Sequence, residues 1–119
     1  MRNFRDLEIW TLSRSIAVGT YQKTKKFPRE EVYGLTSQMR RAAISVPSNI
    51  SEGCSRNSNK EFIRFLEIAI GSSFELETQL SISLELGFLK REEAEELILE
   101  VYRLQSKINS FIKSVKNFH

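Results

Sequence analysis

The sequence predicts an all-α fold: an antiparallel up-down-up-down four-helix bundle formed as one domain by residues 1–119. Apolar residues recur at spacings of three and four almost throughout, which is the pattern of amphipathic helices. Only two prolines and five glycines interrupt the chain. The connections between the second, third and fourth predicted helices are a few residues long, and short connections favour antiparallel neighbours.

The first helix is predicted from about Phe4 to Lys25, with acidic residues in its first turn and lysines at its end. That order of charges complements the helix dipole. Pro28 ends the helix, because proline disfavours helical geometry in the residue before it. Pro28 and the two glutamates that follow Arg29 are then expected to open the second helix.

The second helix carries an apolar stripe that stays in phase on both sides of Pro47. A proline inside a helix removes one backbone hydrogen bond and crowds the carbonyl four residues earlier. Either a kink or a break could result, and the unbroken stripe favours the kink. The residues of the stripe are Val32, Leu35, Met39, Ala42, Ala43, Val46, Ile50 and Cys54.

The third and fourth helices have clear boundary signals. Ser58 and Glu61 have the spacing of a capping box, which satisfies free amides at a helix start. Gly87 is expected to end the third helix in left-handed geometry. The fourth helix is predicted from about Arg91 to Asn117, with glutamates early and lysines late.

The composition argues against most kinds of catalytic site. The chain has one cysteine, Cys54, and one histidine, His119, so a disulfide or a Cys/His metal site cannot form within it. Glycine-rich phosphate loops and Glu-x-x-His motifs are missing from the sequence. Cys54 falls on the apolar stripe, which favours a core role over a nucleophilic one. We therefore expect a non-enzymatic protein without a cofactor or metal.

Charge and hydropathy also bear on location. No stretch reaches the ~18 uncharged apolar residues of a membrane span, and no apolar run follows the N-terminus. We expect a cytoplasmic protein that does not contact membranes, and a single cysteine suits a reducing compartment.

The positive charge is concentrated in the first half of the sequence. Residues 1–64 contain 12 Lys or Arg against 6 Asp or Glu, whereas residues 65–119 contain 6 against 9. This asymmetry is either incidental solvation of helix surfaces or a surface for RNA or DNA phosphates. The candidate phosphate contacts cluster at the first interhelix turn and are Lys23, Lys25, Lys26 and Arg29, with Arg2, Arg5 and Arg14 as alternatives along the first helix.

Two helices carry more apolar residues than one bundle face requires. On a helical wheel, Ile9, Leu12 and Ile16 lie opposite the larger apolar side of the first helix. Ile63, Ile70 and Phe74 lie beside the main stripe of the third. Scattered exposed apolar residues are ordinary, but alignment on one line favours self-association.

A polar ridge lies opposite the apolar stripe of the second helix and consists of Arg41, Ser45, Asn49, Glu52 and Arg56. It could grip phosphates or carboxylates through its arginines. Alternatively, Glu52 could pair with one of the arginines and hold a helix or subunit interface, which is the interpretation we favour.

Glu77 is expected at the edge of the apolar face of the third helix, where a buried carboxylate needs a partner. A structural pair with Arg40 or Arg41 is favoured over a catalytic acid.

The sequence resembles a known family in several motifs. The N-terminal Leu-Glu-Ile-Trp at residues 7–10, Phe27-Pro28, the long segment from Gly34 to Gly53 and the segment 69–77 are similar to the four-helix bundle proteins encoded in intervening sequences of bacterial 23S rRNA genes. The resemblance covers essentially the whole chain.

The resemblance implies a bundle that assembles into a ring-shaped oligomer, a pentamer. It also implies kinship with the accessory variability determinant of diversity-generating retroelements, a basic barrel that binds nucleic acid and a reverse transcriptase. Members are sometimes labelled ribosomal proteins, but the nearly neutral composition without basic tails argues against a ribosome component. The leading hypothesis is an oligomeric nucleic-acid-associated or adaptor module. The alternatives are a small enzyme with a site at subunit interfaces, and a pure protein scaffold.

Overall fold

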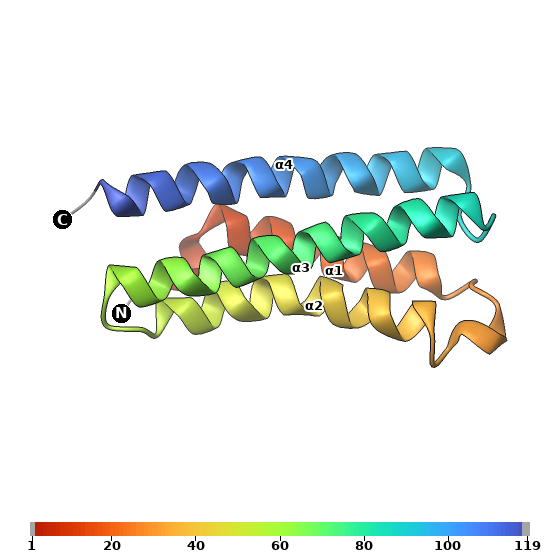
Figure 1. Cartoon of the computed structure of the whole chain (residues 1–119), viewed down its shortest axis with the longest axis horizontal. Helices are drawn as coiled ribbons and strands as arrows, with labels where there is room; N and C mark the ends of the chain where they lie inside the picture. The colour runs from red at the N-terminus through yellow and green to blue at the C-terminus, as the bar shows by residue number, and fades with distance from the viewer. Residues whose placement is uncertain (1, 118–119) are drawn as a thin grey trace.

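The computed structural model describes residues 2–117, and within them the chain is all-helical, with four α-helices and no strand. The helices are α1 (Glu8–Thr24), α2 (Leu35–Cys54), α3 (Asn59–Glu85) and α4 (Arg91–Lys116). Figure 1 shows them side by side, each running opposite to the one before. The molecule measures 48 × 23 × 20 Å. None of the described helices combines the length and the hydropathy needed to cross a membrane.

The first two helices begin later than the sequence predicts. Phe4–Asp6 forms a single 3-10 turn, and α1 starts at Glu8. Pro28 does not open α2, so that prediction is wrong: Arg29–Glu31 is another isolated 3-10 turn. The backbone of Gly34, with φ −113° and ψ −114°, interrupts the helical path before Leu35. The carboxylate of Glu31 accepts a hydrogen bond from the Leu35 amide at 3.1 Å, which stabilises the later start.

α2 is continuous through Pro47, so the alternative of a break there is wrong. Val46 on one side of the proline and Ile50 on the other are both buried. Burial of this continuous stripe offsets the backbone hydrogen bond that Pro47 removes.

α3 begins and ends where the local chemistry predicts. The Ser58 hydroxyl accepts a hydrogen bond from the Glu61 amide at 3.1 Å. At the other end Gly87 has φ +79°, a left-handed conformation that favours glycine. The Phe88 amide donates to the Ser83 carbonyl at 2.9 Å, closing the helix end. The Phe88 ring then packs on Phe27, with ring centroids 5.5 Å apart, and joins the two turns at this end of the bundle.

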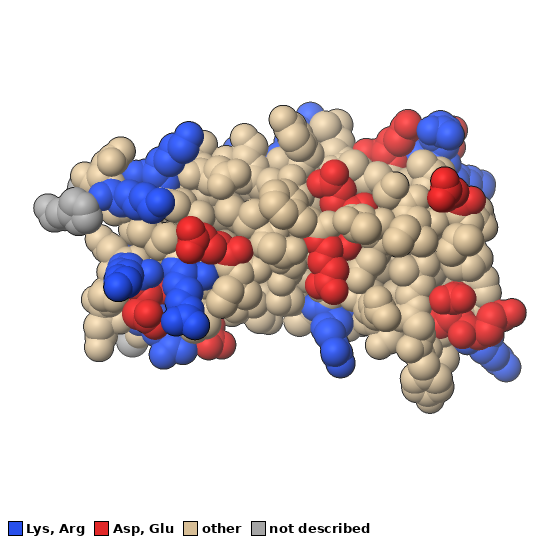
Figure 2. All heavy atoms as spheres, in the orientation of Figure 1, with Lys and Arg blue, Asp and Glu red and all other residues tan. Residues whose placement is uncertain are grey.

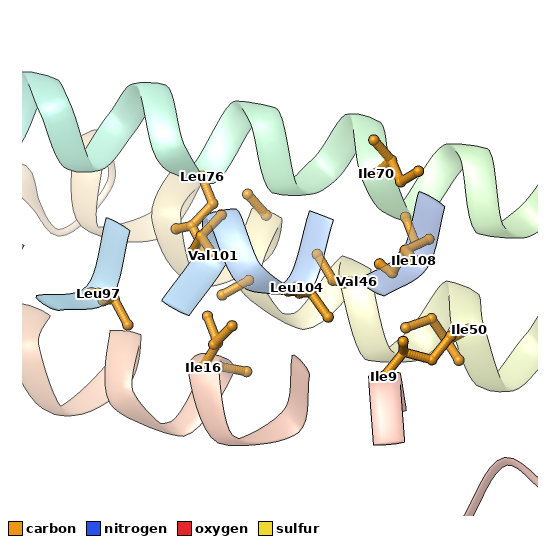
Figure 3. Packing of buried hydrophobic residues seen from close by; sticks show 14 of the residues in the cluster. Ile9, Ile16, Val46, Ile50, Ile70, Leu76, Leu97, Val101, Leu104 and Ile108 are labelled. Carbon is orange, nitrogen blue, oxygen red and sulfur yellow. The ribbon is translucent and has the colours of Figure 1, made fainter. Parts of the chain in front are cut away.

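One hydrophobic cluster fills the space between the four helices. In Figure 3, Ile9 and Ile16 point from α1 into this cluster. They are 4% and 2% exposed. The prediction that these two residues lie on an outward line is therefore wrong.

The reason is that the core-facing side of α1 contains polar residues. Ser13, Thr20 and Thr24 are almost completely buried. Their hydroxyls donate to carbonyls of the same helix, Thr20 to Ile16 at 2.8 Å for example, so burial leaves no donor among them unsatisfied. A wheel that counts only apolar residues misplaces the inner face of such a helix.

Candidate functional site

The polar ridge of α2 divides into two parts. Ser45 and Asn49 face α3: the Ser45 hydroxyl lies 2.8 Å from the Ser72 hydroxyl, and the Asn49 amide donates to the Ser45 carbonyl at 2.8 Å. These hydrogen bonds are internal to the α2–α3 contact. Small side chains there let the two helices approach closely, which is a structural role.

The charged part of the ridge is more exposed. Glu52 and Arg56 form an ion pair at 3.1 Å, one helical turn apart. The Arg56 guanidinium also lies 4.6 Å from the centroid of the Phe65 ring on α3. Arg41 is exposed and makes no ion pair within residues 2–117. The structure therefore pairs Glu52 with Arg56 and does not bring Arg41 to them.

Glu77 has a different partner from the one predicted. It is half-buried, and its carboxylate accepts a hydrogen bond from the Gln105 side chain of α4 at 2.9 Å. Arg40 instead donates to the Thr24 hydroxyl at 2.9 Å and lies over the Tyr21 ring. Arg40 lies on the α1 side of α2, too far round the helix to meet α3.

The cations at the first interhelix turn are partly neutralised. Lys26 lies 2.5 Å and Lys23 3.9 Å from the carboxylate of Glu93 in the first turn of α4. The same carboxylate accepts from the Lys90 amide. The hydrogen bond from Lys26, then that from the Lys90 backbone, holds the pKa of Glu93 below its ordinary value. Lys25 and Arg29 remain exposed.

Arg14 is not close to that turn along the molecule. Its guanidinium lies 5.1 Å from the Trp10 ring centroid, near the start of α1. Arg14 and the predicted phosphate contacts at the first interhelix turn therefore do not form one continuous surface.

The remaining apolar candidates lie at different depths. Leu12 and Ile63 are half-buried against the core, and Ile70 is buried. Phe74 is 54% exposed on the outer side of α3. Of the six residues predicted to form an oligomer interface, only Phe74 is largely available to a partner.

The strongest cationic surface lies at the opposite end of the bundle, and of its cations only Arg2, Arg5 and Arg56 are candidates from the sequence. The N-terminal segment, the α2–α3 connection and the end of α4 meet there (Figure 1). Residues 2–7, 52–66 and 108–117 contain seven Lys or Arg and three Asp or Glu. At the other end, residues 22–37 and 82–97 contain six Lys or Arg and seven Asp or Glu. Figure 2 shows Lys and Arg side chains, in blue, gathered at the cationic end, where the two chain termini lie. The three segments are far apart in sequence and fall in both halves of the chain. A comparison of charge between the two halves therefore does not reveal that their cations lie together.

Four cations at this cationic end, Lys60, Arg64, Lys113 and Lys116, have no ion-pair partner within residues 2–117. Three of them, Lys60, Arg64 and Lys116, border an open groove of about 680 Å³ between α3 and α4, which Glu61 and Glu67 also line. Ile63 contributes apolar surface to the groove. The groove could accept an anionic chain along its cationic rim.

Other chemical candidates are confined to the core or dispersed. Cys54 is 1% exposed, and burial raises the pKa of its thiol, with Arg2 opposing the shift. Within residues 2–117, no three His, Cys, Asp or Glu side chains gather in a way that could hold a metal ion.

These features define a small all-helical protein that has a cationic end and a hydrogen-bonded polar contact between α2 and α3. The chain belongs to the 23S rRNA-intervening sequence protein family, whose sequence pattern matches residues 5–110. A crystal structure from Bacteroides thetaiotaomicron, described as a protein of unknown function from the S23 ribosomal protein family, is similar in fold. It shares 23% identity with a TM-score of 0.80, covering 88% of this chain and 98% of that one. No curated protein matches the chain.

Proposed function

We propose that this protein is a non-catalytic homo-oligomeric bundle that binds RNA or DNA through its cationic end, as a nucleic-acid-associated or adaptor module. The observation that carries the proposal is the concentration of unpaired cations at that end. Lys60 of α3 and Lys116 of α4 line one groove, and neither has an ion-pair partner within residues 2–117, although Glu61 and Glu67 also line that groove. Lys113 adds an exposed cation on α4. Phosphates are the most abundant anions on a nucleic acid surface, and lysines bind them as point charges.

Self-association strengthens the proposal. The resemblance of the sequence implies a pentameric ring, and repeating a modest charge around a ring multiplies the local field. Exposed apolar side chains such as Phe74 and Tyr102, 54% and 63% accessible, support an association surface. A reverse transcriptase or another protein could then be the second partner of the adaptor.

We propose no catalytic role. The enzyme alternative would use Arg41, Glu52 and Arg56. Glu52 and Arg56 form an ion pair with each other at 3.1 Å, and Arg41 is exposed and not part of that pair.

The test compares two matched variants, each lacking three lysines. One replaces Lys60, Lys113 and Lys116 with glutamine, and the other replaces Lys23, Lys25 and Lys26. Binding of structured RNA and duplex DNA is measured by fluorescence anisotropy at several salt concentrations. The first variant should bind more weakly. In a plot of the logarithm of the binding constant against the logarithm of salt concentration, its slope should be shallower by about 0.9 for each duplex phosphate that the variant no longer neutralises. The second should change less, because Glu93 already neutralises part of its cluster.

Failure of the wild type to bind either nucleic acid at low salt would contradict the proposal and favour a protein scaffold. A larger decrease in affinity for the Lys23, Lys25 and Lys26 variant would return the binding surface to the first interhelix turn. Phosphate contacts of this kind carry no sequence information, so RNA and DNA of different sequence should bind alike.

A further inference from the structure

The exposed side of α1 and α2 carries cations but no acidic residue. Residues 9–29 and 32–51 contain seven Lys or Arg and no Asp or Glu. Arg14 and Arg41 are exposed there, and neither has an ion-pair partner within residues 2–117. One turn further along the same helices, Val18 and Ile44 are 53% and 44% exposed. These four residues form the α1–α2 patch, and unpaired cations beside exposed apolar groups fit a partner that is acidic and partly apolar.

The first half of α4 has the opposite composition. Residues 92–100 contain five glutamates and no Lys or Arg. Glu92 and Glu96 are exposed, and in the part of the chain that the structure describes neither has an ion-pair partner. Leu99 and Tyr102, on the same outer side of the helix, are 50% and 63% exposed. These four residues form the α4 patch, and Figure 2 shows acidic side chains, in red, where α4 begins in Figure 1.

The two patches lie at the same height along the bundle. Gly19 of α1 lies beside Leu97 of α4, because a Cβ added to Gly19 would lie 3.7 Å from Leu97 Cδ1. Val18 is therefore level with the middle of the α4 patch. On α2, Arg40 lies over the Tyr21 ring, so the residues that follow it are level with the same part of α1. Both patches are exposed on the outside of different helices, so they can meet only between two chains.

We infer that the α1–α2 patch of one copy binds the α4 patch of the next copy, with the two bundles parallel. This inference rests on the self-association in the proposed function and names its two surfaces. Each copy uses two different patches, so the contact is heterologous. A heterologous contact closes into a ring of odd or even number when its rotation allows, and it is compatible with the five chains that the sequence resemblance implies.

Charge complementarity identifies the occupant as a second copy. Arg41 is level with Tyr21, which lies between the heights of the two α1–α4 contacts at Glu93 and Leu97. Glu96 of a neighbouring parallel copy therefore lies at the height of Arg41. The pair joins two charges that have no ion-pair partner within residues 2–117 of their own chains.

The apolar residues fit the same arrangement. Val18 and Ile44 are level with Leu99 of the neighbouring copy, so the contact removes exposed apolar surface from both chains. Arg14, one turn before Val18, is level with Tyr102, whose ring can bind a guanidinium by a cation–π interaction.

Arg103 is the unfavourable element of the contact. It is exposed beside Tyr102 and carries the same charge as Arg14 of the neighbouring copy. The parallel arrangement thus predicts which charge opposes the contact as well as which charges favour it. It also places the cationic ends of all copies on one side of the assembly, where their fields add.

The experiment measures mass against concentration by sedimentation equilibrium at moderate salt. The first variant, Arg41→Glu with Ile44→Gln, removes the α1–α2 patch, and the second, Leu99→Gln with Tyr102→Gln, removes the α4 patch. Each should weaken association at least tenfold. The matched control is Arg64→Glu with Ile68→Gln on α3, where Ile68 has the same 44% exposure as Ile44. The control should assemble as the wild type does.

Mixing the two patch variants tests whether the contact joins two different surfaces. The first variant retains an intact α4 patch, and the second retains an intact α1–α2 patch. At a concentration where each variant alone is monomeric, the equimolar mixture should form a dimer of two 13.8 kDa chains and grow no further. A contact between two identical patches would not produce this dimer. Arg103→Gln in the wild-type background should tighten association.

An oligomeric wild type whose mass ignores both patch variants, with no dimer in the mixture, would overturn this contact and leave self-association intact. A wild type that stays monomeric at millimolar concentration would overturn both. If the Arg41→Glu, Ile44→Gln variant keeps the wild-type mass but loses RNA binding, the α1–α2 patch belongs to a nucleic acid and the inferred contact is wrong. Nucleic-acid binding by the cationic end is scored separately on the Lys60, Lys113 and Lys116 variant, so failures of the two proposals can be distinguished.

Discussion

Gly53 provides the most direct test of how closely α2 and α3 pack. A Cβ added there would lie 2.8 Å from Phe65 Cβ, 3.1 Å from Phe62 Cδ1 and 3.4 Å from the Phe62 carbonyl oxygen. Phe65 Cβ is fixed to the α3 backbone, so relief requires the two helices to separate. Gly53→Ala should therefore destabilise the protein, although alanine is the better helix former.

The magnitude follows from two opposing effects. Overpacking a tight contact costs about 1–3 kcal/mol, and replacing a helical glycine with alanine gains up to about 1 kcal/mol. The net decrease in the free energy of unfolding should be about 1–2 kcal/mol. Gly19→Ala is the matched control, because its new Cβ would meet only Leu97 Cδ1 at 3.7 Å, an ordinary contact. That variant should gain about 0.5–1 kcal/mol.

Urea unfolding followed by far-ultraviolet circular dichroism measures both variants. The protein concentration is held constant, because association adds to apparent stability. Equal unfolding midpoints for Gly53→Ala and Gly19→Ala, at unchanged slope, would refute the conclusion that the α2–α3 distance leaves no room for a methyl group.

Three further outcomes are expected. Glu93→Gln should lower the free energy of unfolding by about 0.5–1 kcal/mol at neutral pH. Because the pKa of Glu93 is depressed in the folded protein, its stabilising contribution is complete above the ordinary glutamate pKa. In an acid titration that contribution should vanish as the pH falls through the lowered pKa. Cys54 should react with a thiol reagent only at the rate of unfolding, since it is buried with a raised pKa; rapid labelling of native protein would contradict this. Pro47→Ala should raise the urea midpoint, because it allows residue 47 to donate to the Ala43 carbonyl. An unchanged or lower midpoint would contradict the expectation that the missing hydrogen bond destabilises α2.

Local chemistry was sufficient to predict the helix ends that depend on neighbouring residues. Ser58 caps α3 and Gly87 ends it because both signals act within four residues. The continuity of α2 through Pro47 followed from the phase of its buried stripe. The start of α2 was mispredicted because the Pro28 signal produced only a 3-10 turn before Gly34 diverted the backbone.

The functional surfaces were harder to predict, since they depend on residues far apart in the sequence. Lys26 and Glu93 are separated by 67 positions, so their pairing could not be predicted without knowing which turns lie together at that end of the bundle. The cationic end likewise combines three separate segments. The inward face of α1 was misassigned because buried hydroxyls satisfied within their own helix look like surface residues in a sequence.

Those hydroxyls also determine how firmly α1 is held. Only Ile9, Ile16 and Ala17 are buried apolar residues of α1, against six or seven in each of the other helices. Because Thr20 and Thr24 donate to their own helix, these bonds survive if α1 moves away as a unit. α1 is thus the helix whose detachment exposes the least apolar surface. Its backbone amides should exchange with deuterium through partial opening of the bundle, whereas those of α2, α3 and α4 should exchange only on global unfolding.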